Sequence, residues 1–122
     1  MSTIINKNIV IKENNTTLCD LTVNGSITVE ADNVSIVNCT VNSNGDAITS
    51  SGRYLIVKNS KINCRGKAIS LLQGSYNCLV AQNETNSEIF VSGAYNCAVI
   101  LNSADRFVGG DSTTLYVIDN TL

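Results

Sequence analysis

The sequence predicts an all-β fold wound as a solenoid of about five coils, each of roughly 20 residues. The 12 valines, 13 isoleucines and 11 threonines are β-branched residues, which suit the pleated and half-buried surface of a strand. The 17 asparagines and 8 glycines tolerate the left-handed backbone of tight turns, so the strands should be short and their corners frequent. The third observation is a repeat with a period of roughly 20 residues, which is typical of a solenoid.

Length and composition narrow the function classes. A chain of 122 residues is long enough for one core, so we expect residues 1–122 to form a single domain. The formal net charge is -2, so the chain lacks the excess of basic residues that a nucleic-acid binder carries. Neither a membrane-spanning apolar run nor a signal peptide is recognisable, so we expect no membrane insertion. The absence of histidine excludes Ser-His and Cys-His catalysis, and we expect neither a metal nor a cofactor.

A motif of an apolar residue, any residue and then asparagine recurs along the chain. Its asparagines follow one another at unequal steps that all lie close to the period of the solenoid. We expect asparagines at equivalent positions to form a ladder at one corner, because side-chain amides can hydrogen-bond from coil to coil. The copies are Ile36-Val37-Asn38, Val57-Lys58-Asn59, Ala81-Gln82-Asn83, Ile100-Leu101-Asn102 and Ile118-Asp119-Asn120, and the predicted ladder contains Asn38, Asn59, Asn83 and Asn102.

Two further registers give the same period. About 20 residues are too few for a propeller blade, and the period-two alternation of Val34-Ser35-Ile36 excludes a helical repeat. The repeat architecture that remains is a coil built from short strands. One constant step relates Asn42, Gly45, Ala47 and Ile48 to Asn63, Gly66, Ala68 and Ile69, and the same step then relates Ile69 to Phe90. The third register consists of Gly52-Arg53-Tyr54, Gly74-Ser75-Tyr76 and Gly93-Ala94-Tyr95.

These repeats resemble the right-handed parallel β-helix of the pectate-lyase-like superfamily. The resemblance is strongest over residues 34–83 and covers roughly residues 23–122. It implies a single-stranded right-handed parallel β-helix with three short strands in each coil. The resemblance also favours an extracellular or cell-surface location, which the sequence itself leaves unknown.

Equivalent side chains of a solenoid stack in columns, because each coil hydrogen-bonds to the coils on either side of it. We therefore expect like residues to stack on like residues in the core. The predicted inward columns are Val34, Leu55, Cys78 and Cys97, then Ile36, Val57, Val80 and Val99, then Ile48, Ile69 and Phe90.

Pectin-active members of this family use clustered aspartates to bind calcium or to perform acid-base catalysis. The acidic residues of this chain fall at different registers and form no such cluster. Asp46 and Lys67 occupy equivalent positions one coil apart, which predicts a surface ion pair. In an enzyme these two residues would be the catalytic acid and its partner.

Three tyrosines, Tyr54, Tyr76 and Tyr95, each follow a glycine by two residues and should line one edge of the solenoid. Flat aromatic rows can stack on sugar rings, which makes these residues the candidate ligand-binding site. They can equally stack on one another. A protein interface is a third alternative for this edge.

The five cysteines include two pairs that are nearly in register, Cys19 with Cys39 and Cys78 with Cys97. Stacked neighbours can fall within disulfide range, yet inward cysteines usually pack as small apolar residues. We expect mostly free thiols. Cys64 lies in a polar corner and is the cysteine that should be exposed, and no spacing typical of a zinc site occurs.

The ends of a solenoid need a cover, because a bare end leaves strand hydrogen-bonding groups unpaired. We expect residues 1–10 to form one irregular cap strand, with Ile4, Ile5 and Ile9 covering the first coil. No comparable cap follows the last repeat, which predicts either a homo-oligomer that packs through the C-terminal coil or a fragment of a longer chain. The predicted contact residues are Leu115, Val117, Ile118 and Leu122.

The functional hypothesis is a non-catalytic structural or recognition module. It would be a saccharide-binding or assembly domain of a cell-surface or phage-related protein. The alternative is a small polysaccharide lyase or glycoside hydrolase of the pectin type. The two hypotheses differ in whether a polysaccharide is bound or cleaved.

Overall fold

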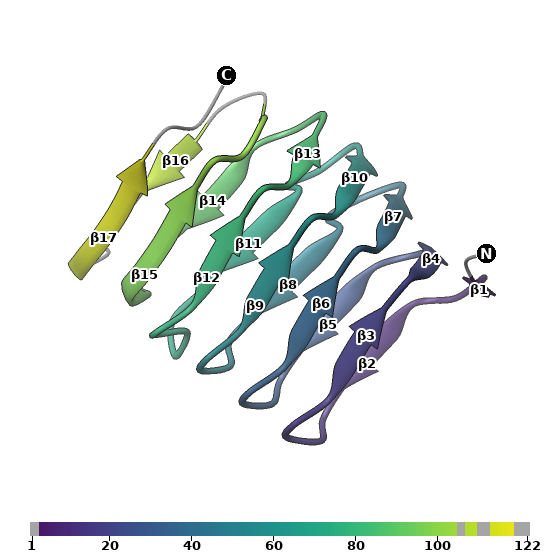
Figure 1. Ribbon diagram of the computed structural model, residues 1–122, viewed down its shortest axis with the longest axis horizontal. Helices are drawn as coiled ribbons and strands as arrows, with labels where there is room; N and C mark the ends of the chain where they lie inside the picture. The colour runs from purple at the N-terminus through teal and green to yellow at the C-terminus, as the bar shows by residue number, and fades with distance from the viewer. Residues whose placement is uncertain (1–2, 105–106, 110–112, 119–122) are drawn as a thin grey trace.

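The computed structural model describes residues 3–104, 107–109 and 113–118, and it shows a parallel β-solenoid (Figure 1). Three parallel sheets run along the solenoid, and each complete coil contributes one strand to each sheet. The first sheet contains β1 (Thr3–Ile5), β4 (Leu21–Asn24), β7 (Thr40–Ser43), β10 (Lys61–Cys64) and β13 (Glu84–Thr85). The second contains β2 (Ile9–Ile11), β5 (Ile27–Val29), β8 (Ile48–Ser50), β11 (Ile69–Leu71), β14 (Ile89–Val91) and β16 (Phe107–Gly109). The third contains β3 (Thr17–Cys19), β6 (Ser35–Val37), β9 (Ile56–Lys58), β12 (Leu79–Ala81), β15 (Tyr95–Ile100) and β17 (Thr113–Ile118).

The core is a set of side-chain columns along the solenoid axis. Two predicted columns are confirmed, because their members are buried and occupy equivalent positions of neighbouring coils. Fully burying a side chain such as Val or Leu contributes about 1.5–3 kcal/mol, so these columns dominate the stability of the fold. They are Val34, Leu55, Cys78 and Cys97, and Ile36, Val57, Val80 and Val99.

The third predicted column is wrong at Phe90. Ile69 pairs with Ile89, which is 1% exposed, and Phe90 pairs with Ser70. The step between these two coils is therefore one residue shorter than the step between the two coils before them. Since successive side chains of a strand point to opposite faces, this difference places Phe90 on the outer face, where it is half-buried.

Residues 3–10, the described part of the predicted cap segment, contain regular strands and not one irregular cap strand. β1 pairs with β4 and β2 pairs with β5, so this segment contributes two regular strands to the first coil. Ile4 is 62% exposed and faces outward, whereas Ile9 is partly buried against the core. Ile5 is also partly buried. The strands extend the sheets instead of covering their end.

The predicted asparagine ladder divides between two neighbouring columns. Asn38 and Asn59 have φ values of 55° and 52°, and the equivalent residues of the next two coils are Gln82 and Leu101. Asn83 lies one residue further on and is buried, as is Asn102. The Nδ2 of Asn83 donates to the carbonyl oxygen of Val57, and its main-chain N–H donates to the Oδ1 of Asn102, both at 3.0 Å. These two amides therefore satisfy backbone groups inside the turn.

A continuous asparagine ladder exists at the end of the first sheet. In each step the Nδ2 of one asparagine donates to the Oδ1 of the preceding one, at 2.7, 3.0 and 3.0 Å. The sequence repeat related the last two of these residues but did not identify the ladder. Its members are Asn6, Asn24, Asn42 and Asn63.

The C-terminal strands continue two sheets. β16 pairs with β14 and β17 pairs with β15, and both are the last strands in their sheets among the described residues. Of the predicted contact residues, Leu115, Val117 and Ile118 lie in β17, and Leu122 lies outside the described residues. No helix long and apolar enough to cross a membrane occurs in the part of the chain that the structure describes.

Candidate functional site

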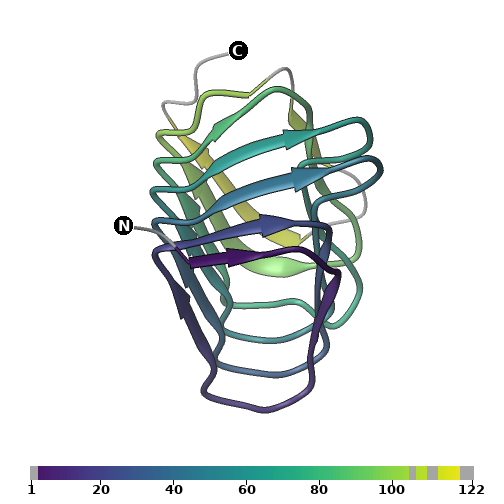
Figure 2. The ribbon, with the colours of Figure 1, turned by 90° about the vertical axis from the view of Figure 1, so that its right-hand side faces the viewer.

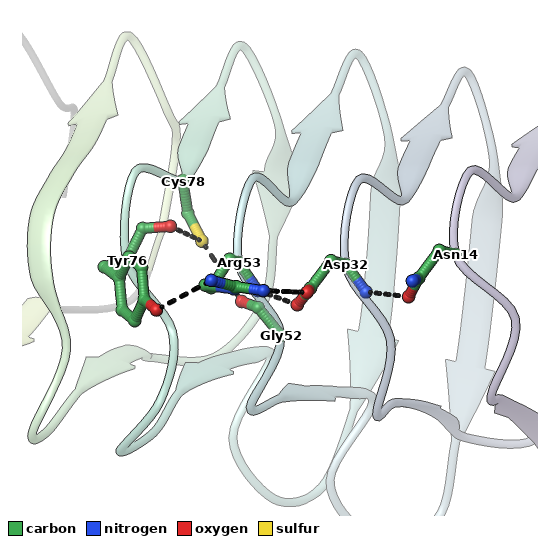
Figure 3. Close-up of polar contacts among 6 residues, drawn as sticks. All are labelled: Asn14, Asp32, Gly52, Arg53, Tyr76 and Cys78. Carbon is green, nitrogen blue, oxygen red and sulfur yellow. Dashed lines mark hydrogen bonds and ion pairs between the residues drawn. The ribbon is translucent and has the colours of Figure 1, made fainter.

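The corner between the second and third sheets carries a column of polar and aromatic residues, here named the corner column. Its members occupy the same position in five successive coils, as the main-chain hydrogen bonds at this corner show. Figure 3 shows the first four side chains in a row along the solenoid. The corner column consists of Asn14, Asp32, Arg53, Tyr76 and Tyr95.

Hydrogen bonds link the first three members. The main-chain N–H of Asp32 donates to the Oδ1 of Asn14 at 2.9 Å. The main-chain N–H of Arg53 donates to the Oδ1 of Asp32 at 3.0 Å, and the Nη2 of Arg53 lies 2.6 Å from the Oδ2 of Asp32. The hydrogen bonds from Arg53 lower the pKa of the Asp32 carboxyl, so this pair is ionised at neutral pH.

Arg53 also reaches the aromatic part of the column. Its Nη1 donates to the Oη of Tyr76 at 3.2 Å, and its Cζ lies 5.6 Å from the centroid of the Tyr76 ring. The rings of Tyr76 and Tyr95 stack with centroids 4.6 Å apart and an interplanar angle of 16°. Because the two rings stack along the solenoid axis, each covers one face of the other. Their edges and hydroxyl groups point away from the axis of the stack.

The predicted row of three tyrosines is wrong at Tyr54. The main-chain N–H of Tyr54 donates to the carbonyl oxygen of Tyr76 at 3.0 Å. In the other coils, the residue that follows a member of the corner column donates in the same way to the next member. Tyr54 therefore lies one residue beyond the corner column, at a position where the other four coils that contribute to the column each have an asparagine. It is 52% exposed and has a φ of 58°. The neighbouring asparagines are Asn15, Asn33, Asn77 and Asn96, all with φ between 56° and 66°.

The reason for the shift is a longer turn before β12. The connection from Leu71 at the end of β11 to Leu79 at the start of β12 is two residues longer than the connection from Ser50 to Ile56. The longer segment contains a turn in which the N–H of Ser75 donates to the carbonyl oxygen of Leu72 at 3.0 Å. Aligning the glycines of the two segments therefore misplaces the tyrosines by one residue.

Gly52 allows two coils to approach closely just before Arg53. A Cβ atom at Gly52 would lie 1.9 Å from the carbonyl oxygen of Ala31, a distance that no side chain tolerates. The carbonyl oxygen of Gly52 accepts a weak hydrogen bond from the Sγ of Cys78 at 3.6 Å (Figure 3). The glycine thus fixes the backbone from which Arg53 projects.

The predicted ion pair between Asp46 and Lys67 is wrong, although the two residues are equivalent. The Oδ1 of Asp46 accepts the main-chain N–H of Lys67 at 2.8 Å. The ammonium group of Lys67 lies instead 5.1 Å from the ring centroid of Phe90, as in a cation–π contact. The carboxyl group of Asp46 and the ammonium group of Lys67 are therefore not paired as a catalytic acid and its partner would be.

Asp46 lines an open polar hollow at another corner, between the first and second sheets. The hollow is lined by ladder residues such as Asn42 and by Thr28, Thr49 and Asp46. Figure 2 shows the turns that follow β7 and β10 protruding beyond the others at this corner. The lining offers amide and hydroxyl groups.

The five cysteines carry free thiols in the structure. Cys64, predicted to be exposed, is only 8% exposed, and its Sγ donates to the carbonyl oxygen of Gly66 at 3.5 Å. Cys19 pairs with Val37, so it is not aligned with Cys39. Cys78 and Cys97 are aligned. Within the described residues, no three metal-ligating side chains come together.

Comparisons of the chain with protein-family models, curated proteins and solved structures found no significant match. The functional argument therefore depends on the geometry of the corner column.

Proposed function

We propose that the protein is a non-catalytic recognition module that binds a saccharide along the corner column. The observation that carries the proposal is the continuous contact from Asp32 through Arg53 and Tyr76 to Tyr95. Each of these groups is held by its neighbour, so binding costs little side-chain entropy. A rigid row of this kind suits a ligand that has hydrogen-bonding groups along its length.

The chemistry of the row matches a polyhydroxylated ligand. The Asp32 and Arg53 side chains are 31% and 47% exposed, so each retains surface for a ligand. Carboxylate oxygens accept hydrogen bonds from hydroxyl groups, and guanidinium and phenol groups donate them. Tyr54 and Tyr95 are 52% and 47% exposed and offer apolar ring surface beside these groups. Sugars present both hydroxyl groups and apolar C–H faces.

The alternative is a small polysaccharide lyase or hydrolase of the pectate-lyase-like superfamily. Two observations favour binding over cleavage. Glycoside hydrolysis generally uses a pair of carboxyl groups across the scissile bond, whereas the carboxylate of Asp46 accepts the main-chain N–H of Lys67 on the next coil. Its expected partner Lys67 is directed to Phe90. Incubation with polygalacturonate and calcium would reveal cleavage as unsaturated or reducing ends, and loss of that activity in Asp46→Asn would support the enzyme hypothesis.

Affinity electrophoresis through gels containing defined polysaccharides tests the binding proposal. We expect one class of polysaccharide to retard the parent protein. Arg53→Ala and Tyr95→Ala should reduce the retardation at least about tenfold in apparent affinity, the loss of one good contact of about 1.4 kcal/mol. Lys61→Ala is the matched control, since Lys61 is an exposed residue of the first sheet.

Tyr76→Phe sharpens the test, because it removes the hydroxyl group that accepts from Arg53 and keeps the stacked ring. We expect intermediate binding by this variant and an almost unchanged melting temperature. Equal retardation of the parent, Arg53→Ala and Tyr95→Ala in every polysaccharide gel would overturn the proposal.

A further inference from the structure

The tripeptide Tyr-Asn-Cys occurs twice, at residues 76–78 and 95–97, on neighbouring coils. Each residue of one copy contacts its counterpart in the other. The tyrosine rings stack, and the Nδ2 of Asn96 donates to the Oδ1 of Asn77. Cys78 and Cys97 occupy equivalent buried positions in the core. The two copies therefore have the same register through the whole corner, from the surface to the interior.

No other two of the five cysteines, all within residues 3–104, occupy equivalent positions. Cys19 pairs with Val37, and Cys64 pairs with Ser43. Cys39 precedes Thr40, which pairs with Thr22 and Lys61, so its neighbours in the column are Leu21 and Ser60. Cys78 and Cys97 are therefore the one pair of cysteines that the register places opposite each other for a disulfide.

The backbone places Cys78 and Cys97 directly opposite each other. Leu79 pairs with Ala98, and the N–H of Ala98 donates to the carbonyl oxygen of Cys78 at 2.9 Å. Neighbouring parallel strands are about 4.8 Å apart, which lies within the range of Cα separations that a disulfide spans. Both side chains belong to one inward column and are 3% and 0% exposed, so the two thiols are direct neighbours in the core.

We propose that Cys78 and Cys97 are a site of oxidative modification, at which a peroxide forms a disulfide between neighbouring coils. In the first step the Cys97 thiolate attacks the peroxide, the O–O bond breaks, and Cys97 becomes a sulfenic acid. In the second step the Cys78 sulfur attacks the sulfenic sulfur, and the S–O bond breaks. Two thiols and one hydrogen peroxide give one disulfide and two water molecules.

The two neighbouring thiols have different surroundings, which assigns their roles. The adjacent Cys78 thiol lowers the pKa of Cys97 to about 7, and the adjacent Cys97 thiol together with burial raises the pKa of Cys78. Since the thiolate is the nucleophile, Cys97 reacts first and Cys78 resolves it. Burial selects a small, uncharged oxidant that can enter when the coil opens briefly. A bulky glutathione disulfide would have to displace the stacked tyrosines.

The disulfide would fix the spacing of the corner column, because Tyr76 and Tyr95 lie two residues before the cysteines. The proposal does not depend on saccharide binding. It concerns the connection between two coils, and its test measures covalent bonds and stability.

The test treats the full-length folded protein with hydrogen peroxide, then unfolds it in an alkylating reagent. A protease that cleaves after glutamate separates the two cysteines at Glu84 and Glu88. Mass spectrometry should show the two peptides linked, with both cysteines lost from the alkylated fraction. Cys39 and Cys64 should remain alkylated. The linked protein should melt about 5 °C higher or more, and a thiol reductant should reverse this shift.

Cys78→Ala and Cys97→Ala should each abolish the linked peptide, and Cys39→Ala should retain it. Alanine is used because these positions are apolar and buried. The proposal is overturned if Cys78 and Cys97 remain alkylated under peroxide that oxidises the exposed Cys19. It is equally overturned if the link appears only when peroxide is added to unfolded protein.

Discussion

Arg53 donates two side-chain hydrogen bonds to the Oδ2 of Asp32 on the preceding coil, at 2.6 Å and 3.1 Å. Both residues lie at the same position of their coils, where the next two coils have tyrosines. The guanidinium group therefore connects an acidic part of the corner column to an aromatic part. The corner column is therefore one continuous row of contacts. Because the row contains the ionised pair of Asp32 and Arg53, its stability should depend on pH.

Replacing Arg53 by Met should reduce stability at neutral pH and have little effect in acid. The pKa of Asp32 is lowered in the folded protein by the hydrogen bonds from Arg53. A lowered carboxyl pKa contributes stability that is fully present above the unfolded-state pKa, about 3.9, and is lost as the pH falls through the folded-state pKa. We expect the melting temperatures of parent and variant to differ at pH 7, and the difference to shrink only below about pH 4, as the pH falls through the lowered pKa of Asp32. Arg65→Met is the control, and a difference that stays constant with pH would contradict the assignment.

Replacing Tyr54 by Asn should stabilise the protein. Tyr54 has a φ of 58° at a position where four other coils have asparagine. A left-handed backbone costs a bulky residue roughly 1–2 kcal/mol, and asparagine adopts it more readily. We expect the free energy of unfolding to rise by about 0.5–1 kcal/mol in urea titrations. The reverse change, Asn33→Tyr, should lower it, and a less stable Tyr54→Asn would show that the tyrosine ring makes a compensating contact.

Two glycine substitutions should differ sharply in their effect on stability. Gly52→Ala would put a Cβ atom 1.9 Å from the Ala31 carbonyl oxygen, so the coils must separate. Overpacking of this kind costs about 1–3 kcal/mol. Gly45→Ala has nothing within 4 Å of its Cβ and should be nearly neutral. Chemical denaturation of both variants checks the expectation, and similar stabilities would rule out close approach of the two coils at Gly52.

Self-association through the C-terminal coil remains a prediction, with β17 as the contact strand. β17 is the last strand of the third sheet among the described residues, and its Val117 pairs with Val99. An edge strand presents N–H and C=O groups that can pair with another chain. Val117→Lys should convert an oligomer to a monomer in light scattering. A monomeric parent protein would refute the prediction.

The sequence alone determined the fold class, the period and most of the core. Residues such as Ile36 and Val57, or Val34 and Leu55, recur at the period of the coil and are buried in the columns that this period predicts. These features are predictable because stacking requires like side chains at equivalent positions, and the requirement appears directly in the sequence.

Only the tertiary structure decided the register at corners where turn length varies. Along the third sheet Leu18 pairs with Ile36, which pairs with Val57, then Val80 and Val99 follow, and the spacing in the sequence changes at every step. A change of one residue in the spacing moves a side chain to the other face or to the next column, as it did for Phe90, Tyr54 and Asn83. The contact between Arg53 and Tyr76 was missed for the same reason, since a local motif cannot reveal how many residues each turn absorbs. Strand pairing sets that number, because the backbone of each coil must meet the hydrogen-bonding groups of the coil before it.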